Sequence, residues 1–481
     1  MENAVSISGG TGALGPNSLD AISLGRRIST NVYSVSIAEK LLYGDELHLL
    51  VFGPNGSGKT TRLLMTNLLS LENRSIFVVD PKGELAAVTA PFRRTVSNVV
   101  IINPFGVHID RPGYEDLKSD GFNPLLSIDP ASTSFNSDAA LLAEALISIE
   151  SKDPHWDRSA RELLAALIMY VCIEARRLGH TPTIGDVRAL LCMACEEPTD
   201  DREGSGIPAI ALEMIKSNIA GLRNKAGQFK DWTNEIRSVA SAARQQTESF
   251  DDDEIAIDLA KGAFDFREMK ERPTTVYLIL PPDMLERHAK WLRLLVTSAL
   301  RGVLRLREPG EPKALFMLDE FAALGHLQII ETVWAQVRGY GIQIMPVLQD
   351  IHQLKTIYKD RWETFVGQAG VVATFGARDM ASAKWMSERA GEKTVVAASL
   401  NTSRSAGPTG DSYNESMSMG QVKVPFMTPH KFLGLRGGTL AIWLAGVRDT
   451  IPAYAPAYWE ITKLLDRQRA NPYYQKVGRA I

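Results

Sequence analysis

Residues 47–61 decide the fold, and they read Leu-His-Leu-Leu-Val-Phe-Gly-Pro-Asn-Gly-Ser-Gly-Lys-Thr-Thr. An apolar run that predicts a strand leads directly into the pattern G-x-x-x-x-G-K-T, and a helical segment follows over residues 62–71. The glycines of such a loop let the backbone wrap around a phosphate chain with its N–H groups pointing inward, and the following helix adds the positive end of its dipole. The sequence therefore predicts a nucleoside triphosphate site formed by Gly53, Pro54, Asn55, Gly56, Ser57, Gly58, Lys59, Thr60 and Thr61.

The side chains of the site have separate predicted tasks. In this type of loop, Lys59 places a positive charge at the β- and γ-phosphates and the Thr60 hydroxyl ligates Mg²⁺. A later apolar run, residues 312–320, ends in Asp319 and Glu320. We assign Asp319 to the metal and Glu320 to the attacking water, because P-loop NTPases use acids in these roles. The alternative is an Asp-Glu pair that only caps the next helix, and the phosphate loop favours hydrolysis over it.

Length and composition exclude several classes of protein. A chain of 481 residues exceeds one ordinary core and predicts about two or three domains. Hydrophobic residues make up 45% and charged residues 23% of the chain, as in a soluble globular protein, and no uncharged apolar run reaches the roughly eighteen residues of a membrane span. The net charge of −3 lacks the basic excess typical of nucleic-acid binding. Cys172, Cys192 and Cys195 indicate a reducing compartment, and the pair Cys192-x-x-Cys195 lacks the second pair that a zinc site needs.

The pattern along the chain predicts an α/β fold of the RecA-like P-loop NTPase type with an inserted all-α domain. Short apolar strands are expected at residues 47–52, 75–80, 99–102, 275–280, 314–318, 342–348, 371–375 and 439–444, with helical periodicity alone between 136 and 262. We divide the chain into a partly disordered N-terminal segment (1–45), two parts of the nucleotide-binding domain (46–128 and 272–481) and the inserted domain (129–271). Residues 399–421, rich in Ser, Asn, Thr and Gly, predict a flexible loop, and residues 458–466 predict a closing helix.

Several strings together resemble a known family, the type IV coupling proteins, which are hexameric ATPases that feed DNA and proteins into conjugation and type IV secretion machines. Two of them, the phosphate loop and Met-Leu-Asp-Glu-Phe at 317–321, are common to P-loop ATPases. Ile-Asn-Pro-Phe at 102–105 and Phe-Asn-Pro-Leu at 122–125 also match. The more specific combination is Asp-Pro-Lys-Gly-Glu in the string at 78–84 together with Arg-Gly-Tyr-Gly-Ile at 338–342 and the Gln of Val-Leu-Gln-Asp at 347–350.

The resemblance implies roles for two further residues. Gln349 matches the family's γ-phosphate sensor, and the alternative is an amide that closes a strand end. Arg338 matches an arginine finger that reaches the nucleotide of a neighbouring subunit, and the alternative is a surface arginine at a helix end. Arg378 is a competing candidate for the finger. The inserted helical domain matches the family's all-α domain, which helps to receive substrates.

These observations together predict an ATP- and Mg²⁺-dependent motor. It would drive relaxase-bound single-stranded DNA, effector proteins or both into a secretion channel, and would form a homo-hexamer on binding ATP and DNA. Typical members begin with membrane-spanning helices, which this sequence lacks, so either that segment was removed or a partner recruits a member without it. We expect a cytoplasmic protein held at the inner membrane by components of the secretion system. The alternatives are a soluble DNA translocase of the chromosome-segregation class and a nucleotide-switched substrate adaptor without motor activity. The first would carry a DNA-reading tail, and the second would show no DNA-stimulated ATP turnover.

Overall fold

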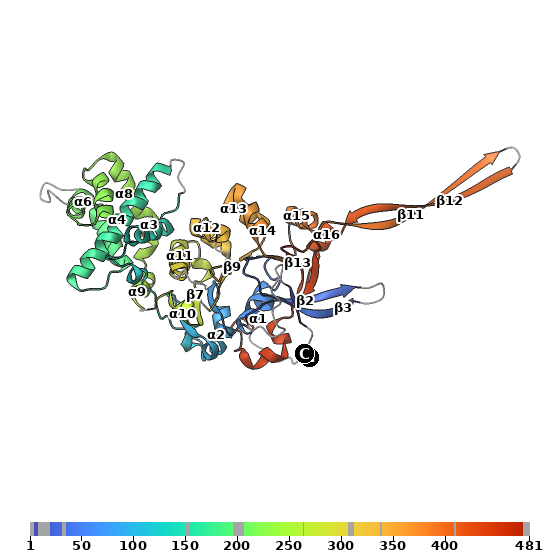
Figure 1. The fold of residues 1–481 in the computed structure, drawn as a ribbon, viewed down its shortest axis with the longest axis horizontal. Helices are drawn as coiled ribbons and strands as arrows, with labels where there is room; N and C mark the ends of the chain where they lie inside the picture. The colour runs from blue at the N-terminus through green and yellow to red at the C-terminus, as the bar shows by residue number, and fades with distance from the viewer. Residues whose placement is uncertain are drawn as a thin grey trace.

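The computed structural model describes residues 4–7, 20–30, 35–149, 154–195, 206–262, 264–305, 312–336, 339–407 and 410–474. Three parts follow one another along the long axis of the molecule (Figure 1). A helical lobe lies at one end, an α/β body lies in the middle, and a long β-hairpin projects from the other end (Figure 1). The α/β class with a helical insertion is confirmed.

The predicted parallel strands form one side of a 12-stranded sheet. Their bounds are β4 (Leu49–Phe52), β5 (Ser75–Asp80), β6 (Asn98–Ile102), β7 (Thr274–Ile279), β8 (Ala314–Leu318), β9 (Ile342–Leu348) and β10 (Val371–Thr374). They lie in the order β10-β4-β9-β8-β5-β7-β6, each parallel to its neighbours. Strands buried on both faces have nearly continuous apolar sequences, and their carboxyl ends meet at one edge of the sheet.

Helices cover both faces of this sheet. One face packs against η1 (Lys59–Leu64), α1 (Met65–Leu68), α2 (Glu84–Val96) and the C-terminal turns η10 (Tyr458–Glu460) and η11 (Thr462–Arg467). The other face packs against α11 (Ala289–Arg305), α12 (Gln328–Gln336), α13 (Ile351–Tyr358), α14 (Trp362–Gln368) and α15 (Met380–Ala390). Alternate residues of β4 belong to the two cores, Leu50 and Phe52 to one and Leu49 and Val51 to the other, so the phosphate loop starts from a strand held on both sides.

The helical lobe is inserted between β6 and β7. It contains α3 (Phe135–Leu146), α4 (Pro154–Leu178), α5 (Ile184–Ala194), α6 (Ile207–Ile215), α7 (Ala220–Ala226), α8 (Asn234–Gln246) and α9 (Asp253–Ala260). The short helix α10 (Glu268–Glu271) packs against the α/β body instead. Its Met269 carbonyl accepts a hydrogen bond of 2.6 Å from Ser75 Oγ at the start of β5. The domain boundaries predicted above remain a proposal, and α10 favours an earlier end of the insert.

The structure adds strands to the N-terminal segment. Residues 22–43 lie within the segment expected to be partly disordered, yet they form β2 (Ile22–Thr30) and β3 (Val35–Tyr43) at the edge of the sheet, with β1 (Ala4–Ile7) beside β3. Strand β2 pairs with β14 (Ile451–Tyr454), which follows β13 (Thr439–Leu444), the strand expected to be the last. A partner more than four hundred residues away in the sequence leaves no local signal. The rest of the N-terminal stretch expected to be disordered lies outside the described residues.

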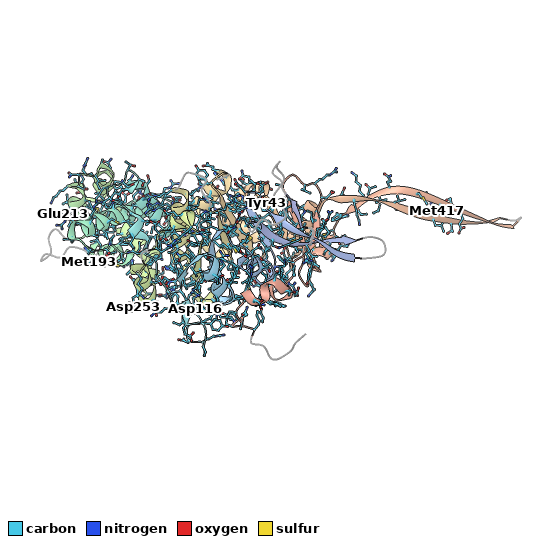
Figure 2. All side chains as sticks on the ribbon, turned by 60° about the horizontal axis from the view of Figure 1, so that its bottom comes forward. Tyr43, Asp116, Met193, Glu213, Asp253 and Met417 are labelled. Atoms are coloured by element: carbon cyan, nitrogen blue, oxygen red, sulfur yellow. The ribbon has the colours of Figure 1, made fainter. Side chains whose placement is uncertain are left out.

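The prediction of a flexible loop at residues 399–421 is wrong. This stretch lies within a hairpin of β11 (Glu392–Gly407) and β12 (Gly410–Pro425), paired in continuous antiparallel register (Figure 1). Its content of Ser, Thr and Gly resembles that of a loop. Successive side chains of a strand point to opposite faces, however, so the two faces of this strand pair carry different side chains. One face carries Val396, Leu400, Met417 and Met419, each 61–72% exposed, and the other carries the hydrogen-bonded pair Ser399 and Ser418. Figure 2 labels Met417, which lies on the hairpin away from the body.

Because these side chains are exposed, we expect the hairpin to contribute little to the stability of the body. Joining Val396 to Gln421 through a two-residue Asn-Gly turn would close the hairpin near its base. The shortened protein should keep its thermal unfolding midpoint within about 2 °C, because exposed residues bury little apolar area. Differential scanning calorimetry measures this, and a loss of several degrees would show that the hairpin supports the core.

The C-terminal helix expected at residues 458–466 is replaced by the two short turns η10 and η11. Among the described residues, no helix combines the length and the apolar character that crossing a membrane requires.

Candidate active site

The phosphate loop lies at the carboxyl end of β4, at the sheet edge where parallel strands end. It is anchored by Gly53 N, which donates a hydrogen bond of 3.0 Å to Leu348 O on β9. Gly58 has φ of +96° immediately before the helix that begins at Lys59, a conformation that side chains rarely adopt. The glycine of the G-K-T pattern is therefore required by the turn from strand to helix.

Lys59 is folded over its own loop. The side chain is 9% exposed, and its ammonium group donates hydrogen bonds to Gly53 O and, at 3.2 Å, to Pro54 O. Burial lowers the pKa of Lys59, and the neighbouring Asp319 and Glu320 oppose that effect. The buried Ser57 hydroxyl nearby has no hydrogen-bond partner among the residues that the structure describes. A buried ammonium group and an unpartnered hydroxyl in one glycine-rich loop fit the phosphate chain of a nucleotide.

The strand β8 delivers both predicted acids to the loop. Thr60 Oγ1 lies 3.4 Å from Asp319 Oδ2, so the two predicted metal ligands are adjacent. Burial raises the pKa of Asp319 to about 6, with Lys59 acting in the opposite direction. A buried carboxylate beside a hydroxyl is a donor set that suits Mg²⁺, which binds oxygen ligands and keeps several waters.

Glu320 has an unusual backbone. Its φ of +55° places a non-glycine residue in the left-handed region, and its N–H donates to Asp319 Oδ1 at 3.2 Å. The Glu320 carboxylate accepts a hydrogen bond of 3.1 Å from Gln349 Nε2 at the end of β9. A residue keeps a strained backbone of this kind only where its surroundings fix its position. Here the hydrogen bonds to Asp319 and from Gln349 fix Glu320.

Of the two arginine candidates, Arg378 is within the residues that the structure describes. Arg338 lies outside the described residues. Arg378, which follows β10, donates a hydrogen bond of 2.7 Å from Nη2 to Asn55 O in the phosphate loop of the same chain. The structure therefore brings together the loop, Asp319, Glu320 and Gln349, and places Arg378 at its own loop.

Two further acids, from the string at 78–84, line the cavity around the phosphate loop. Asp80 ends β5, and Glu84 begins α2. Asp80 is 1% exposed and accepts a hydrogen bond of 2.9 Å from Ala86 N. Burial raises the pKa of Asp80 to about 8, and the charges of Glu84 and Asp319 add to the effect. Asp80 stands at the carboxyl end of an apolar strand, as Asp319 does, and that position in the sequence is the signal that could have identified it.

Asp80 leads to a pH-dependent prediction for the protein without nucleotide. The pKa of this group is about 8 in the fold and about 4 in an unfolded chain, so unfolding releases its proton at intermediate pH. The free energy of unfolding should therefore fall as the pH rises from about 4 to about 8. Asp80→Asn keeps an acceptor for Ala86 N without a titrating group. We expect it to raise the thermal midpoint by about 2 °C or more at pH 8 and by less at pH 5. An equal effect at both pH values would contradict the assignment.

The cavity around the loop is large, at about 2100 Å³, and one wall of it comes from the C-terminal segment that ends at Tyr474. Tyr458, Trp459, Asn471 and Tyr474 contribute to this wall. The sequence predicts only a closing helix for this segment and no contact with the nucleotide cavity. The segment is held in place between α1 and α2 because Arg467 Nη1 donates to Leu69 O at 2.9 Å and Arg469 Nε donates to Ala87 O at 2.7 Å.

Known proteins share both the sequence pattern and the fold. The model of the family described as "Type IV secretory system Conjugative DNA transfer" matches residues 18–476. The conjugal transfer protein TraG of Rhizobium radiobacter is 26% identical over 414 residues, which cover 83% of this chain and 60% of that protein. The chain thus spans about 60% of the length of this curated relative.

Two solved structures share the fold. The plasmid coupling protein TrwB in complex with the non-hydrolysable ATP analogue ADPNP is 18% identical, with a TM-score of 0.61 and 86% of each chain covered. TrwB in complex with ADP and Mg²⁺ is 18% identical, with a TM-score of 0.60 and 85% of each chain covered. The family match extends over nearly the whole chain and agrees with the motifs around the phosphate loop. The chain therefore belongs to the type IV secretory conjugative DNA-transfer family, the family of the type IV coupling proteins.

Proposed function

We propose that this protein is an ATP-hydrolysing coupling protein, which recruits DNA, proteins or both and drives them into a type IV secretion or conjugation channel. The observation that carries the proposal is the convergence of Lys59, Thr60, Asp319, Glu320 and Gln349 at one edge of the sheet. The name of TraG as a conjugal transfer protein and the nucleotide complexes of TrwB support the same function.

Each residue of the site has a task in hydrolysis. The loop from Gly53 to Thr61 would hold the phosphates of ATP, and Thr60 and Asp319 would hold Mg²⁺. Mg²⁺ supplies positive charge that stabilises the transferred phosphoryl group. Lys59 adds its charge at the same phosphates once it leaves the carbonyl groups of its own loop.

Two residues on neighbouring strands act on the attacking water. Glu320 accepts its proton as general base. Gln349 orients Glu320 through their 3.1 Å hydrogen bond, and its amide can also contact the γ-phosphate. The raised pKa of Asp319 reflects a buried charge without full compensation, which a bound cation would provide.

Arg338 is the proposed arginine finger in trans. A finger stabilises negative charge on the transferred phosphoryl group, so an isolated subunit would hydrolyse ATP slowly. Arg378 contacts its own loop, and this cis contact favours Arg338 for the role in trans. Assembly into a homo-hexamer with ATP and DNA would complete each site. The proposed location is cytoplasmic, at the inner membrane through components of the secretion system, with a relaxase–DNA complex or effector proteins as cargo.

Single-stranded DNA tests the motor. Specific ATPase activity should rise with protein concentration and again when single-stranded DNA is added, because each complete site would need a neighbour. An ATPase rate that depends neither on protein concentration nor on single-stranded DNA would favour the nucleotide-switched adaptor. A rate stimulated equally by double-stranded DNA would favour the chromosome-segregation class.

A mixing experiment tests the finger. Lys59→Ala subunits and Arg338→Ala subunits should each be inactive alone and recover partial activity when mixed, because some interfaces pair an intact loop with an intact finger. In the control, Lys59→Ala is mixed with a variant that carries both substitutions, which should give no recovery. If the first mixture also stays inactive, the trans mechanism is wrong.

A further inference from the structure

Beyond the phosphates, the cavity has a second wall that could receive the rest of a nucleotide. Its volume of about 2100 Å³ exceeds the roughly 300–1,000 Å³ of ordinary small-molecule sites. The phosphate loop with Asp319 and Glu320 accounts for only part of its lining. The C-terminal turn η10 and the segment after it provide another part of the lining.

The direction of a bound nucleotide follows from the loop itself. Lys59, Asp319 and Glu320 mark the γ-phosphate end, whereas the backbone at the start of the helix cradles the α- and β-phosphates. The nucleoside must therefore leave the loop on the side of Thr61 and Arg62. Thr61 lines the cavity, and so does Trp459 of η10, the turn that Arg62 contacts through Ala455 O and Glu460.

Arg62 ties η10 directly to the end of the phosphate loop. Its guanidinium donates to Ala455 O at 2.8 Å and contacts the Glu460 carboxylate at 3.4 Å. Glu460 also accepts hydrogen bonds of 2.7 Å from Tyr454 Oη and 3.1 Å from Ala457 N. Each of these contacts restrains the turn on which Trp459 stands, so the position of the indole is coupled to the loop.

Trp459 itself has an open face. The indole is 47% exposed, and the Tyr458 ring touches it edge-on with ring centroids 4.8 Å apart. A large aromatic side chain held on a restrained turn and left half exposed is suited to stack against a planar ring. We infer that Trp459 is the platform on which the nucleobase of the bound nucleotide stacks, an inference that rests on the proposed function.

Tyr474 offers a matched control in the same cavity. It is 64% exposed, but its neighbours tie it to a different part of the sheet edge. Tyr473 Oη donates to Lys82 O at 2.9 Å, and Arg111 Nη1 donates to Pro472 O at 2.6 Å, so this segment follows the loops after β5 and β6. Tyr474 therefore lies away from the exit of the nucleoside.

Stacking by an aromatic platform tolerates different bases, because every base has a π-face. The platform should thus serve ATP and GTP alike and make no contribution to the binding of inorganic triphosphate. The base-independent part of the affinity belongs to the phosphate loop and Mg²⁺.

The test is isothermal titration calorimetry on the full chain with Mg²⁺, using the non-hydrolysable imido analogues of ATP and GTP and inorganic tripolyphosphate. Trp459→Ala should bind both nucleotide analogues about tenfold more weakly and bind tripolyphosphate as the unchanged protein does. Trp459→Phe should recover most of the affinity, and Tyr474→Ala should change none of the three.

The outcomes distinguish a failure of the Trp459 platform from a failure of the proposed function. Equal binding of the analogues by the unchanged protein and Trp459→Ala would overturn the platform alone. So would an equal loss for tripolyphosphate, or a loss confined to one of the two nucleotides. If the unchanged protein bound neither analogue, the proposed function would fall, and the platform with it.

Discussion

Lys59→Ala should abolish ATP hydrolysis, with a rate reduced by a factor of about a thousand or more. The Lys59 ammonium group contacts the carbonyl groups of Gly53 and Pro54 in its own loop, and in hydrolysis its charge serves the phosphates. Substitution leaves these carbonyl groups without a donor, a cost of about 1 kcal/mol that lowers the thermal midpoint only slightly. Steady-state phosphate release and a thermal melt, measured on the same preparation, separate loss of activity from loss of fold.

Lys216→Ala is the matched control for this substitution. Lys216 is an exposed lysine beside α6 that pairs with Glu213 at 2.6 Å, in the helical lobe and outside the nucleotide cavity. The Lys216→Ala protein should hydrolyse ATP as fast as the unchanged protein. If Lys59→Ala also kept the original rate, the phosphate loop would not be the site of hydrolysis.

Glu320→Gln should lower ATP turnover by a factor of roughly a hundred or more while ATP binding is retained. The amide has the shape of the carboxylate and can still accept the hydrogen bond from Gln349 Nε2, but it cannot take a proton from water. The φ of +55° is unchanged by the substitution, so the turn should keep its conformation. Calorimetric titration with Mg²⁺ and ATP measures binding, and single-turnover kinetics measure the chemical step.

Glu84→Gln distinguishes Glu320 from the other acid in the cavity. Glu84 is buried at the start of α2 and accepts a hydrogen bond of 3.2 Å from Asn471 Nδ2, an arrangement that positions the C-terminal segment. The Glu84→Gln protein should therefore keep a turnover close to that of the unchanged protein. If Glu320→Gln kept the original turnover and Glu84→Gln lost it, Glu84 would be the general base.

Local patterns in the sequence were sufficient for the parallel half of the sheet. The strands from β4 to β10 are short, apolar and buried on both faces, and each starts or ends within about two residues of its predicted bounds. The phosphate loop and the acids after β8 were predicted for the same reason, since the chemistry of phosphate binding requires specific residues at fixed spacing. Gln349 came from the family resemblance, and the structure adds its contact with Glu320.

Structure that depends on distant pairing was not predictable in this way. Strand β2 lies beside β14, and the C-terminal segment lies between α1 and α2, through contacts that join opposite ends of the chain. The hairpin of β11 and β12 was mistaken for a loop because its polar residues alternate with small and apolar ones, and neither face is covered by the body. A strand without a buried face has a weak sequence signal.

The sequence by itself determined the fold class, the phosphate loop and the identities of the acids, because each depends on residues close together in the chain. Only the tertiary structure decided that Gln349 meets Glu320, that Arg378 serves its own loop and that Trp459 faces the nucleotide cavity. The physical reason is that parallel strands bring their carboxyl ends to one edge, so side chains from distant segments meet there. Their mutual distances depend on the packing of the whole sheet, which no local pattern encodes.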